Sequence, residues 1–453
     1  MARSANQVLA LTLRKLSRSE NTDGIRRIIQ KSHPADLAHV MRSLTSVQQV
    51  RVFREIHPYE KAAEVLLEME PALSERIIGK IDDDFLSILI LQMAPDEVAS
   101  ILRTLDTPRK DILLAELGTQ EASEAEVLIS YENESAGSLM SPNYFAVDSE
   151  ITAAEAIRKL HENEYDIIFY LYVINEHGQL VGVVSLRELV RASGQTPVKD
   201  IMLGDVVRVL VSADQEDVAS LVARYNLLAL PVIDPGNQLV GVITVDDIID
   251  VIRMEATEDI MHAVGAGVVA SPNESFAISL RSRMPWVTPT FVSGLAGMGL
   301  LYYYQPALST FVPLLILIPM VTGIAQHISA QSSTIVTRWL ATGRLEFAEL
   351  RRIIIREMFL GTIIATFFGA LIAAVVGIIF KNNQFSMGFF AFVLGVGLST
   401  ISATLVSVTI GSMAPLVFKR SGVDPALATG PVVTTLIDVL ALWVYLFCLT
   451  SFL

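Results

Sequence analysis

The stretch QLVGVVSLRELV (Gln179–Val190) recurs 59 residues later as QLVGVITVDDII (Gln238–Ile249). At the same offset, YVIN (Tyr172–Asn175) matches PVID (Pro231–Asp234). Each copy has β-branched residues in alternation around a turn, followed by a short amphipathic run, which predicts strand, turn, strand and helix. We therefore expect two βαββα units in tandem.

A second repeat lies upstream, where PADLAHVMRSL (Pro34–Leu44) matches PDEVASILRTL (Pro95–Leu105). Proline in the first turn, acids just after it and apolar residues at helical spacing are typical of helix starts. Residues 20–130 are thus predicted to form a superhelix of short helices. Residues 51–150 carry 8 basic and 21 acidic residues, most of which are expected on a solvated face.

The two halves of the chain differ in charge. Residues 1–280 hold 24 Lys and Arg against 43 Asp and Glu, whereas residues 281–453 hold only 10 and 5. Because a membrane span needs about 20 apolar residues, the second half predicts five spans. We place two of them within 282–337, on either side of a tyrosine cluster at 302–304, and the others at about 356–380, 389–417 and 425–453.

Basic residues set the predicted orientation. They precede the first span and lie between spans two and three and between spans four and five, whereas the opposite loops offer only Lys381. By the positive-inside rule the protein lies in the cell (inner) membrane with its N-terminus on the cytoplasmic side and its C-terminus on the outer side.

Several function classes are excluded. The single Cys448 rules out an intramolecular disulfide framework and a Cys-rich metal site. The sequence has no P-loop, nucleophile elbow or HExxH motif, so we do not expect an enzyme. We expect no nucleic-acid partner either.

The tandem units resemble a cystathionine-β-synthase (CBS) domain pair, with Met140-Ser141-Pro142 and Asp200-Ile201-Met202 at their starts. An acidic helical part, a CBS pair and five spans occur together in the MgtE family of magnesium channels and transporters, which this chain resembles over nearly its whole length. The matching signatures are SYENESAGSLM (130–140), YLYVINEHGQLVGVVSLREL (170–189), LLALPVIDPGNQLVGVITVDDIIDVIRMEATEDI (227–260), RMPW (283–286), IIIREMFLG (353–361) and DPALATGPVVTTLIDVLALWVY (424–445).

The resemblance implies a multi-domain membrane protein. We expect an acidic all-α N-terminal domain at 1–135, α/β CBS units at 136–198 and 199–257, a connecting plug helix at 258–283 and an all-α five-helix transmembrane domain at 284–453. CBS pairs commonly bind adenosine nucleotides, so ATP is a possible cofactor. Thr244 and Asp247 stand where the family places its ribose and phosphate contacts.

Asp438 is the only acidic residue in the fifth predicted span. A carboxylate in hydrocarbon is costly unless it faces water, a cation or a partner, so we interpret Asp438 as a pore ion site; the alternative is a salt bridge to Arg356. The resemblance implies a homodimer in which two such carboxylates meet. The preceding Ala428-Thr429-Gly430-Pro431 breaks the helix and could expose carbonyl groups.

A gate is expected between the CBS pair and the membrane. Within the acidic run from Asp246 to Asp259, the residues Asp247, Asp250 and Glu258 fall near one helical face, with Glu255 beside them. The resemblance implies that Mg²⁺ bound among these and neighbouring acids closes the channel. The predicted regulatory ligands are Asp96, Glu97, Asp246, Asp247, Asp250, Glu255, Glu258 and Asp259.

One segment departs from the family pattern. Where the family has a glycine-rich run, this chain has GIAQHISAQSS (Gly323–Ser333), with His327 at a position that is asparagine in the family. A histidine could favour Mn²⁺, Co²⁺ or Zn²⁺, or it could simply hydrogen-bond a neighbouring span. Transport of another divalent metal, a cation-coupled exporter and a non-conducting membrane-bound metal or nucleotide sensor therefore remain alternatives to a Mg²⁺ channel.

Overall fold

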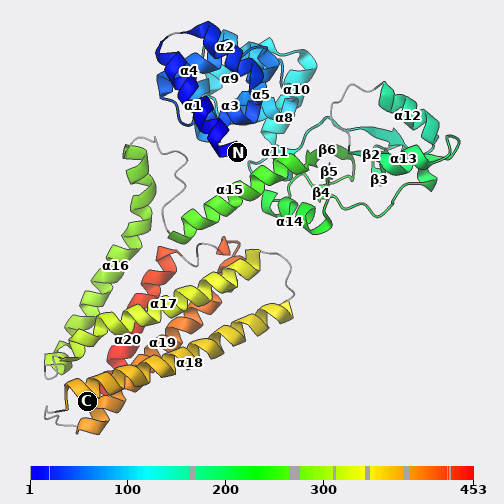
Figure 1. The fold of residues 1–453 in the computed structure, drawn as a ribbon. Helices are drawn as coiled ribbons and strands as arrows, with labels where there is room; N and C mark the ends of the chain where they lie inside the picture. Colours follow the sequence, from blue (N-terminus) through cyan, green and yellow to red (C-terminus); the bar gives the residue numbers. More distant parts are fainter. Residues whose placement is uncertain are drawn as a thin grey trace. The chain divides into compact units, whose positions relative to one another are not determined.

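The computed structural model describes residues 2–19, 21–162, 169–264, 276–309, 313–341, 347–381, 388–425, 427 and 430–452. The chain forms two compact units, Met1–Arg253 and Met254–Leu453. Figure 1 draws the first unit in blue to green and the second in light green to red.

The first unit begins with a series of short helices. They are α1 (Ala2–Arg18), α2 (Thr22–Lys31), α3 (Pro34–Met41), α4 (Ser46–Arg54), α5 (Tyr59–Leu67), α6 (Pro71–Ile78), α7 (Asp83–Ile90), α8 (Pro95–Arg103), α9 (Thr107–Glu116), α10 (Thr119–Ser130) and α11 (Ala136–Leu139). Pro34 and Pro95 stand in the first turns of α3 and α8, where a missing N–H costs no helical hydrogen bond. Both predicted helix starts are confirmed.

Alternate helices of this series pack on each other, α1 on α3, α3 on α5, α5 on α7 and α7 on α9. Their apolar residues, spaced three and four apart as in Leu37, Val40 and Met41, are buried in one continuous core. This stacking confirms the predicted all-α N-terminal domain.

Two three-stranded sheets follow, with strand orders β1-β2-β3 and β4-β5-β6. In each, the first pair is parallel and the second antiparallel. The elements are β1 (Ala146–Asp148), α12 (Ala153–His161), β2 (Tyr170–Ile174), β3 (Leu180–Ser185), α13 (Leu186–Arg191), η1 (Val198–Asp200), β4 (Val209–Leu210), α14 (Gln215–Tyr225), β5 (Ala229–Ile233), β6 (Leu239–Thr244) and α15 (Val245–Val264). The two predicted α/β units are therefore confirmed.

The methionines at the start of each α/β unit pack into the sheet of the other unit. A Cβ added to Gly241 of β6 would lie 2.6 Å from Sδ of Met140, and Gly182 of β3 faces Met202 in the same way. Backbone bridges join Ser141 to Val242 and Val183 to Leu203 next to these contacts. The two units thus form an intimate pair.

The helical domain and the second α/β unit share a hydrophobic core. Ala99 of α8 and Leu128 of α10 belong to the same buried cluster as Leu230 and Ile243 of the second sheet. This shared core holds the start of α8 beside the end of β6 within the first unit.

The second unit contains the end of α15, which begins in the first unit, and long helices. The long helices are α16 (Phe276–Ser309), α17 (Pro313–Ala341), α18 (Phe347–Ile379), α19 (Phe389–Arg420) and α20 (Pro431–Phe452). Three stretches of the described residues are long and apolar enough to cross a membrane, namely Glu349–Ile379, Phe389–Arg420 and Pro431–Phe452. The predicted all-α membrane region is confirmed at this level, and five spans remain a prediction for which α16 and α17 would supply the first two.

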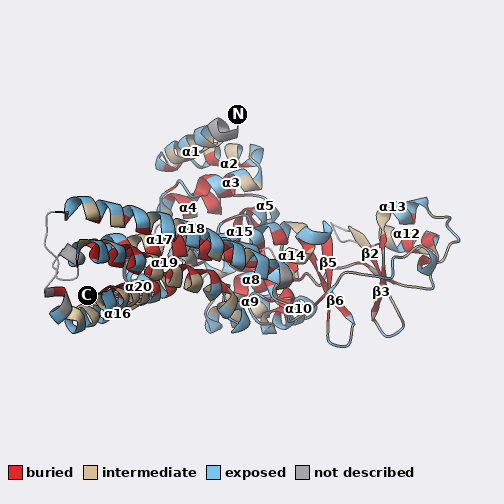
Figure 2. Cartoon of the chain, turned by 90° about the horizontal axis from the view of Figure 1, so that it is seen from below, coloured by how far each residue is buried: buried red, intermediate tan, exposed pale blue. Residues whose placement is uncertain are grey.

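Large apolar side chains cover the outward faces of these helices. Figure 2 shows exposed residues alternating with buried ones along them. On α18, Phe359, Phe367 and Ile378 are each more than 60% exposed. Such a surface is costly in water but is the expected surface of a helix in lipid.

The predicted connecting helix at 258–283 falls partly on residues 265–275, which lie outside the described residues. Residues 258–264 form the end of α15, and residues 276–283 form the start of α16.

Candidate cation and nucleotide sites

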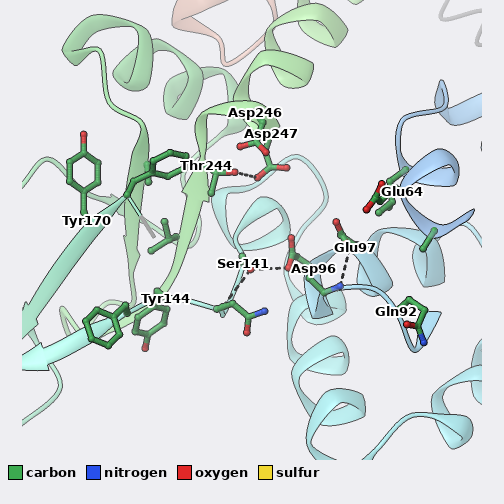
Figure 3. A pocket seen from close by; sticks show the side chains of 18 of the residues that line it. Glu64, Gln92, Asp96, Glu97, Ser141, Tyr144, Tyr170, Thr244, Asp246 and Asp247 are labelled. Carbon is green, nitrogen blue, oxygen red and sulfur yellow. Dashed lines mark hydrogen bonds between the residues drawn. The ribbon is translucent and has the colours of Figure 1, made fainter. Parts of the chain in front are cut away.

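A pocket of about 590 Å³ lies in the first unit between the helical domain and the α/β pair. Figure 3 shows its walls, with α8 on one side and the sheet that ends at Thr244 on the other. Its lining includes no basic residue among those described, and six carboxylates, those of Glu60, Glu64, Asp96, Glu97, Asp246 and Asp247. Four of the eight predicted regulatory ligands therefore lie together, and we call these six residues the acidic pocket.

The first turn of α8 positions two of these acids. Oγ of Ser141 donates a hydrogen bond of 2.9 Å to Oδ1 of Asp96. The backbone N–H of Ala94 donates a hydrogen bond of 2.8 Å to Oε2 of Glu97, which reaches back over the helix start. Both carboxylates are thus held by local helix-start chemistry.

The first turn of α15 positions two more of these acids, Asp246 and Asp247. Oγ1 of Thr244 donates a hydrogen bond of 2.7 Å to Oδ2 of Asp247. The first repeat has the equivalent bond, since Oγ of Ser185 lies 3.1 Å from Oε2 of Glu188. At the position equivalent to Asp246, however, the first repeat has Arg187.

The environment of the acidic pocket disfavours negative charge. Burial, with smaller contributions from the neighbouring Glu97 and Asp246, raises the pKa of Asp96 to about 6 against the opposing hydrogen bond from Ser141. Burial likewise raises the pKa of Asp247 to about 6. The pKa of Glu97 is raised by burial and then by Asp247 and Glu64. A cation would relieve this crowding of carboxylates.

The acidic pocket suits a hydrated hard cation better than a dehydrated one. Among the residues that the structure describes, no three Asp, Glu, His or Cys side chains are already arranged around one ion position. Carboxylate oxygens are the ligands that Mg²⁺ prefers, and Mg²⁺ usually keeps several waters. The donor set therefore fits Mg²⁺ held partly through water.

Sequence reasoning missed Glu60 and Glu64, which α5 contributes to the pocket. They are four residues apart and so lie on one helical face, a signal that was present but not specific. It also missed the aromatic end of the same pocket, lined by Tyr144, Phe169 and Tyr170.

Asp250 and Glu255 are not among the residues that line this pocket. Asp250 is exposed and forms an ion pair of 3.2 Å with Arg253 on the same helix. Of the predicted acids on α15, only Asp246 and Asp247 reach the acidic pocket.

The remaining two predicted regulatory ligands, Glu258 and Asp259, lie in the second unit. Oε1 of Glu258 is 3.6 Å from Nε2 of His262, and Nδ1 of His262 is 3.1 Å from Oδ2 of Asp424, in the loop after α19. Burial raises the pKa of Asp259, and Asp424 raises it further. The end of α15 is thus held against the loop that leads into α20.

A backbone contact reinforces this junction. A Cβ added to Gly430, just before α20, would lie 2.9 Å from the carbonyl oxygen of His262. Only a residue without a side chain permits so close an approach. Ala428 and Thr429, which were predicted to break the helix here, lie outside the described residues.

Asp438 lies in α20, within a candidate span, and is half-buried. No ion pair between described residues joins it to Arg356, which is exposed on α18. The alternative interpretation of Asp438 as the partner of Arg356 therefore has no support in the described part of the chain. His327 is exposed on α17, and no hydrogen bond to another helix is recorded for it among the described residues.

Comparison with known families matches three regions of the chain. They are the MgtE intracellular N domain at residues 32–134, the CBS domain at residues 136–194 and 198–254, and the MgtE divalent cation transporter domain at residues 318–448.

Similar proteins extend along almost the whole chain. The magnesium transporter MgtE of Thermus thermophilus is 33% identical over 97% of both chains, and that of Bacillus subtilis is 31% identical over 98% of this chain and 97% of its own. A solved cytosolic domain of the Mg²⁺ channel MgtE in complex with ATP is 34% identical, with a TM-score of 0.50, and the match covers 53% of this chain and 99% of that one. Together with the domain matches, these relatives show that this chain belongs to the MgtE family of divalent cation transporters.

Proposed function

We propose that this protein carries Mg²⁺ across the membrane along a path that includes Asp438. The observation that carries the proposal is a half-buried carboxylate inside the candidate span Pro431–Phe452. Intramembrane acids usually mark ion paths, because an unpaired carboxylate in hydrocarbon is expensive. Relatives named as magnesium transporters support Mg²⁺ as the ion.

The transport path is proposed to lie in a homodimer. One carboxylate per chain neutralises only half of a dication, whereas two Asp438 carboxylates facing each other would balance its charge. Such a pair could hold a partly hydrated Mg²⁺ without stripping its waters. Cross-linking and native mass measurement in detergent and in lipid test this assembly, and a chain found only as monomers would exclude it.

Flux into liposomes tests the proposed ion. Purified protein should admit Mg²⁺ faster than Mn²⁺, Co²⁺ or Zn²⁺. Faster entry of a transition metal would favour the alternative raised by His327, which is exposed on α17. A need for a counter-ion gradient would indicate a coupled exporter, and no flux of any of the four would leave a membrane-bound sensor as the function.

Regulation is proposed to act through the acidic pocket. Mg²⁺ bound there would join α8 of the helical domain to the start of α15, because the pocket draws carboxylates from both. For bound Mg²⁺ to close the path, it must bind the closed state more tightly than the open one. Asp250, Glu255, Glu258 and Asp259 are proposed as further ligands along α15 that act with the partner chain.

ATP is proposed as a second regulatory ligand, by similarity to the cytosolic domain solved with ATP. Thr244 and Asp247 could hold ribose hydroxyls beside the aromatic end of the pocket. The triphosphate would meet six carboxylates there, so binding in this cleft should require Mg²⁺. The equivalent cleft of the first repeat has Arg187 in place of Asp246 and so fits phosphate better.

Nucleotide binding to the full chain separates these two clefts. Arg187→Gln should weaken ATP binding if the first repeat holds the phosphates. Asp247→Asn should weaken it if the second repeat holds the ribose. ATP affinity that neither substitution changes would exclude both placements.

The proposed location is the cell (inner) membrane, with a cytoplasmic N-terminus and an external C-terminus. Arg351 and Arg352 at the start of α18 and Lys419 and Arg420 at the end of α19 support this orientation. Labelling of single cysteines placed at each terminus from one side of sealed cells tests it. Labelling of both termini from the same side would contradict five spans.

A further inference from the structure

The inward face of α18 is interrupted by an acid. Leu350, Ala365, Ile372 and Val376 are almost fully buried, and their spacings of fifteen, seven and four residues, each close to a whole number of helical turns, place them on one stripe. Glu357 occupies the same stripe, seven residues after Leu350. It lies within the candidate span Glu349–Ile379.

Glu357 is 7% exposed and is the only Asp, Glu, Lys, Arg or His in the buried class among the described residues. Oγ of Ser332 on α17, itself 3% exposed, lies 3.2 Å from Oε2 of Glu357 and donates to it. No ion pair with a basic residue is recorded for Glu357 in the described part of the chain. The neighbouring Arg356 is exposed and so does not share this buried position.

The surroundings of Glu357 are a junction of three helices and not the lipid face. Gly361, one turn further along α18, packs so closely on Val408 of α19 that a Cβ would lie 2.5 Å from it. Three residues before Ser332, Oγ of Ser329 donates a hydrogen bond of 2.7 Å to the carbonyl oxygen of Ser407 on α19. Hydroxyl groups therefore line the interior between α17 and α19 close to the carboxylate.

Helix packing alone gives no reason for an acid here. A polar side-chain contact between membrane helices contributes little to stability on average, and a serine or threonine would supply it. An ionised carboxylate with a single hydroxyl donor is costly to bury. A cation that binds reversibly to the carboxylate would offset this cost of burial.

We propose that Glu357, assisted by Ser332, is a second intramembrane binding site for the transported dication, in addition to Asp438. Its ligands would be the carboxylate, the serine oxygen and retained water, the oxygen set that suits a hard divalent cation. This inference rests on the proposed transport function.

The test is Mg²⁺ flux into liposomes by the full chain, with thermal unfolding measured on the same preparations. Glu357→Gln keeps the size of the side chain and an oxygen for Ser332 but removes the charge, and should lower flux at least tenfold while the unfolding temperature stays within a few degrees. Glu357→Asp keeps the charge but withdraws it by one methylene, and should transport with a half-saturating Mg²⁺ concentration raised several-fold. Ser332→Ala should raise that concentration about two- to threefold.

The matched control is Glu349→Gln, which removes an exposed acid from the first turn of the same helix. It should transport like the wild type. Wild-type flux in well-folded Glu357→Gln protein would overturn the second site, even if Asp438→Asn abolishes flux. The second site would also be rejected if Glu357→Gln lowers the unfolding temperature and Glu357→Asp leaves the half-saturating Mg²⁺ concentration unchanged. That pair of results would indicate a structural role for Glu357. Absence of flux in the wild type would instead refute the proposed function.

Discussion

Oγ of Ser141 donates a 2.9 Å hydrogen bond to Oδ1 of Asp96 and so links the start of the first α/β unit to the first turn of α8. This bond lowers the pKa of Asp96, against the larger raising effect of burial. It therefore helps to keep one carboxylate of the acidic pocket ionised, which is the form that can bind a cation.

Ser141→Ala should shift the pH dependence of Mg²⁺ binding upward. Without the hydroxyl, the pKa of Asp96 rises further above 6, so a higher pH is needed before the carboxylate is available. Limited proteolysis of the full chain, with and without Mg²⁺ between pH 5 and 8, gives the midpoint of Mg²⁺ protection. Glu162→Gln, which changes an exposed acid paired with Arg158 and outside the proposed ligands, is the control and should leave the midpoint in place.

The apo protein should become less stable as the pH rises from about 4 to 6. Asp96 and Asp247 have folded pKa values of about 6, above their ordinary value of 3.8, so the folded state binds more protons than the unfolded state in this range. Their contribution to stability is complete below pH 4 and is lost by pH 6.

Mg²⁺ should reverse this loss at pH 7, because it replaces the protons, and should have little effect at pH 5. Thermal unfolding of the full chain in detergent measures both trends. The Asp96→Asn/Asp247→Asn double variant should show a flatter pH profile and a smaller effect of Mg²⁺. An unchanged profile in that variant would mean that the pocket carboxylates do not titrate as proposed.

Gly241→Ala should destabilise the α/β pair by about 1–3 kcal/mol, the usual cost of overpacking. The added Cβ would lie 2.6 Å from Sδ of Met140 and close to its Cγ and Cβ, so the whole methionine would have to move. Combination with Met140→Ala should recover part of the loss by making room. Denaturant unfolding of the single and double variants measures this coupling, and simple addition of the two losses would contradict the contact.

The fold was largely predictable because the chain repeats itself. The copies that begin at Tyr172 and Pro231 place strand, turn, strand and helix in the same order twice, and β2, β3 and α13, then β5, β6 and α15, follow that order in the structure. Pro34 and Pro95 likewise marked helix starts through local chemistry. What local patterns could not give is the packing of α8 against the second sheet, which depends on contacts such as that of Ala99 with the core beneath Leu230.

The site was only partly predictable, because local sequence patterns do not give tertiary packing. The pairs of adjacent acids at 96–97 and 246–247 were visible in the sequence, and tertiary packing brings them into one pocket. The sequence did not predict that Glu60 and Glu64 also line the pocket, because acids at helical spacing occur on many solvated faces. Glu357 was overlooked because Arg356 precedes it at the edge of a predicted span, where charges are ordinary; its burial appears only in three dimensions.

Gly430→Ala should weaken the closing effect of Mg²⁺ without abolishing transport. Its Cβ would lie 2.9 Å from the carbonyl oxygen of His262, a backbone atom that cannot rotate away, so the end of α15 would have to separate from the start of α20. Flux at high internal Mg²⁺ should rise relative to the wild type. The control is Gly422→Ala, in the same loop, whose Cβ would meet nothing within 4 Å although its positive φ of 71° adds local strain. Equal effects of the two substitutions would point to loop strain and not to the contact.

Asp438→Asn should abolish transport while leaving the fold intact. Asparagine keeps the size and polarity of the side chain but removes the only acidic charge of α20. In a homodimer the substitution removes two charges from one small region. Attraction between a dication and each carboxylate at about 4 Å is worth several kcal/mol even at an effective dielectric constant near 20, which corresponds to at least a tenfold loss of flux. Expression, dimerisation and Mg²⁺ protection of the cytosolic domains should remain normal.

If Asp438 instead balanced Arg356, folding and flux would fall together and Arg356→Gln would partly restore both. Wild-type flux in well-folded Asp438→Asn protein would remove Asp438 from the transport path.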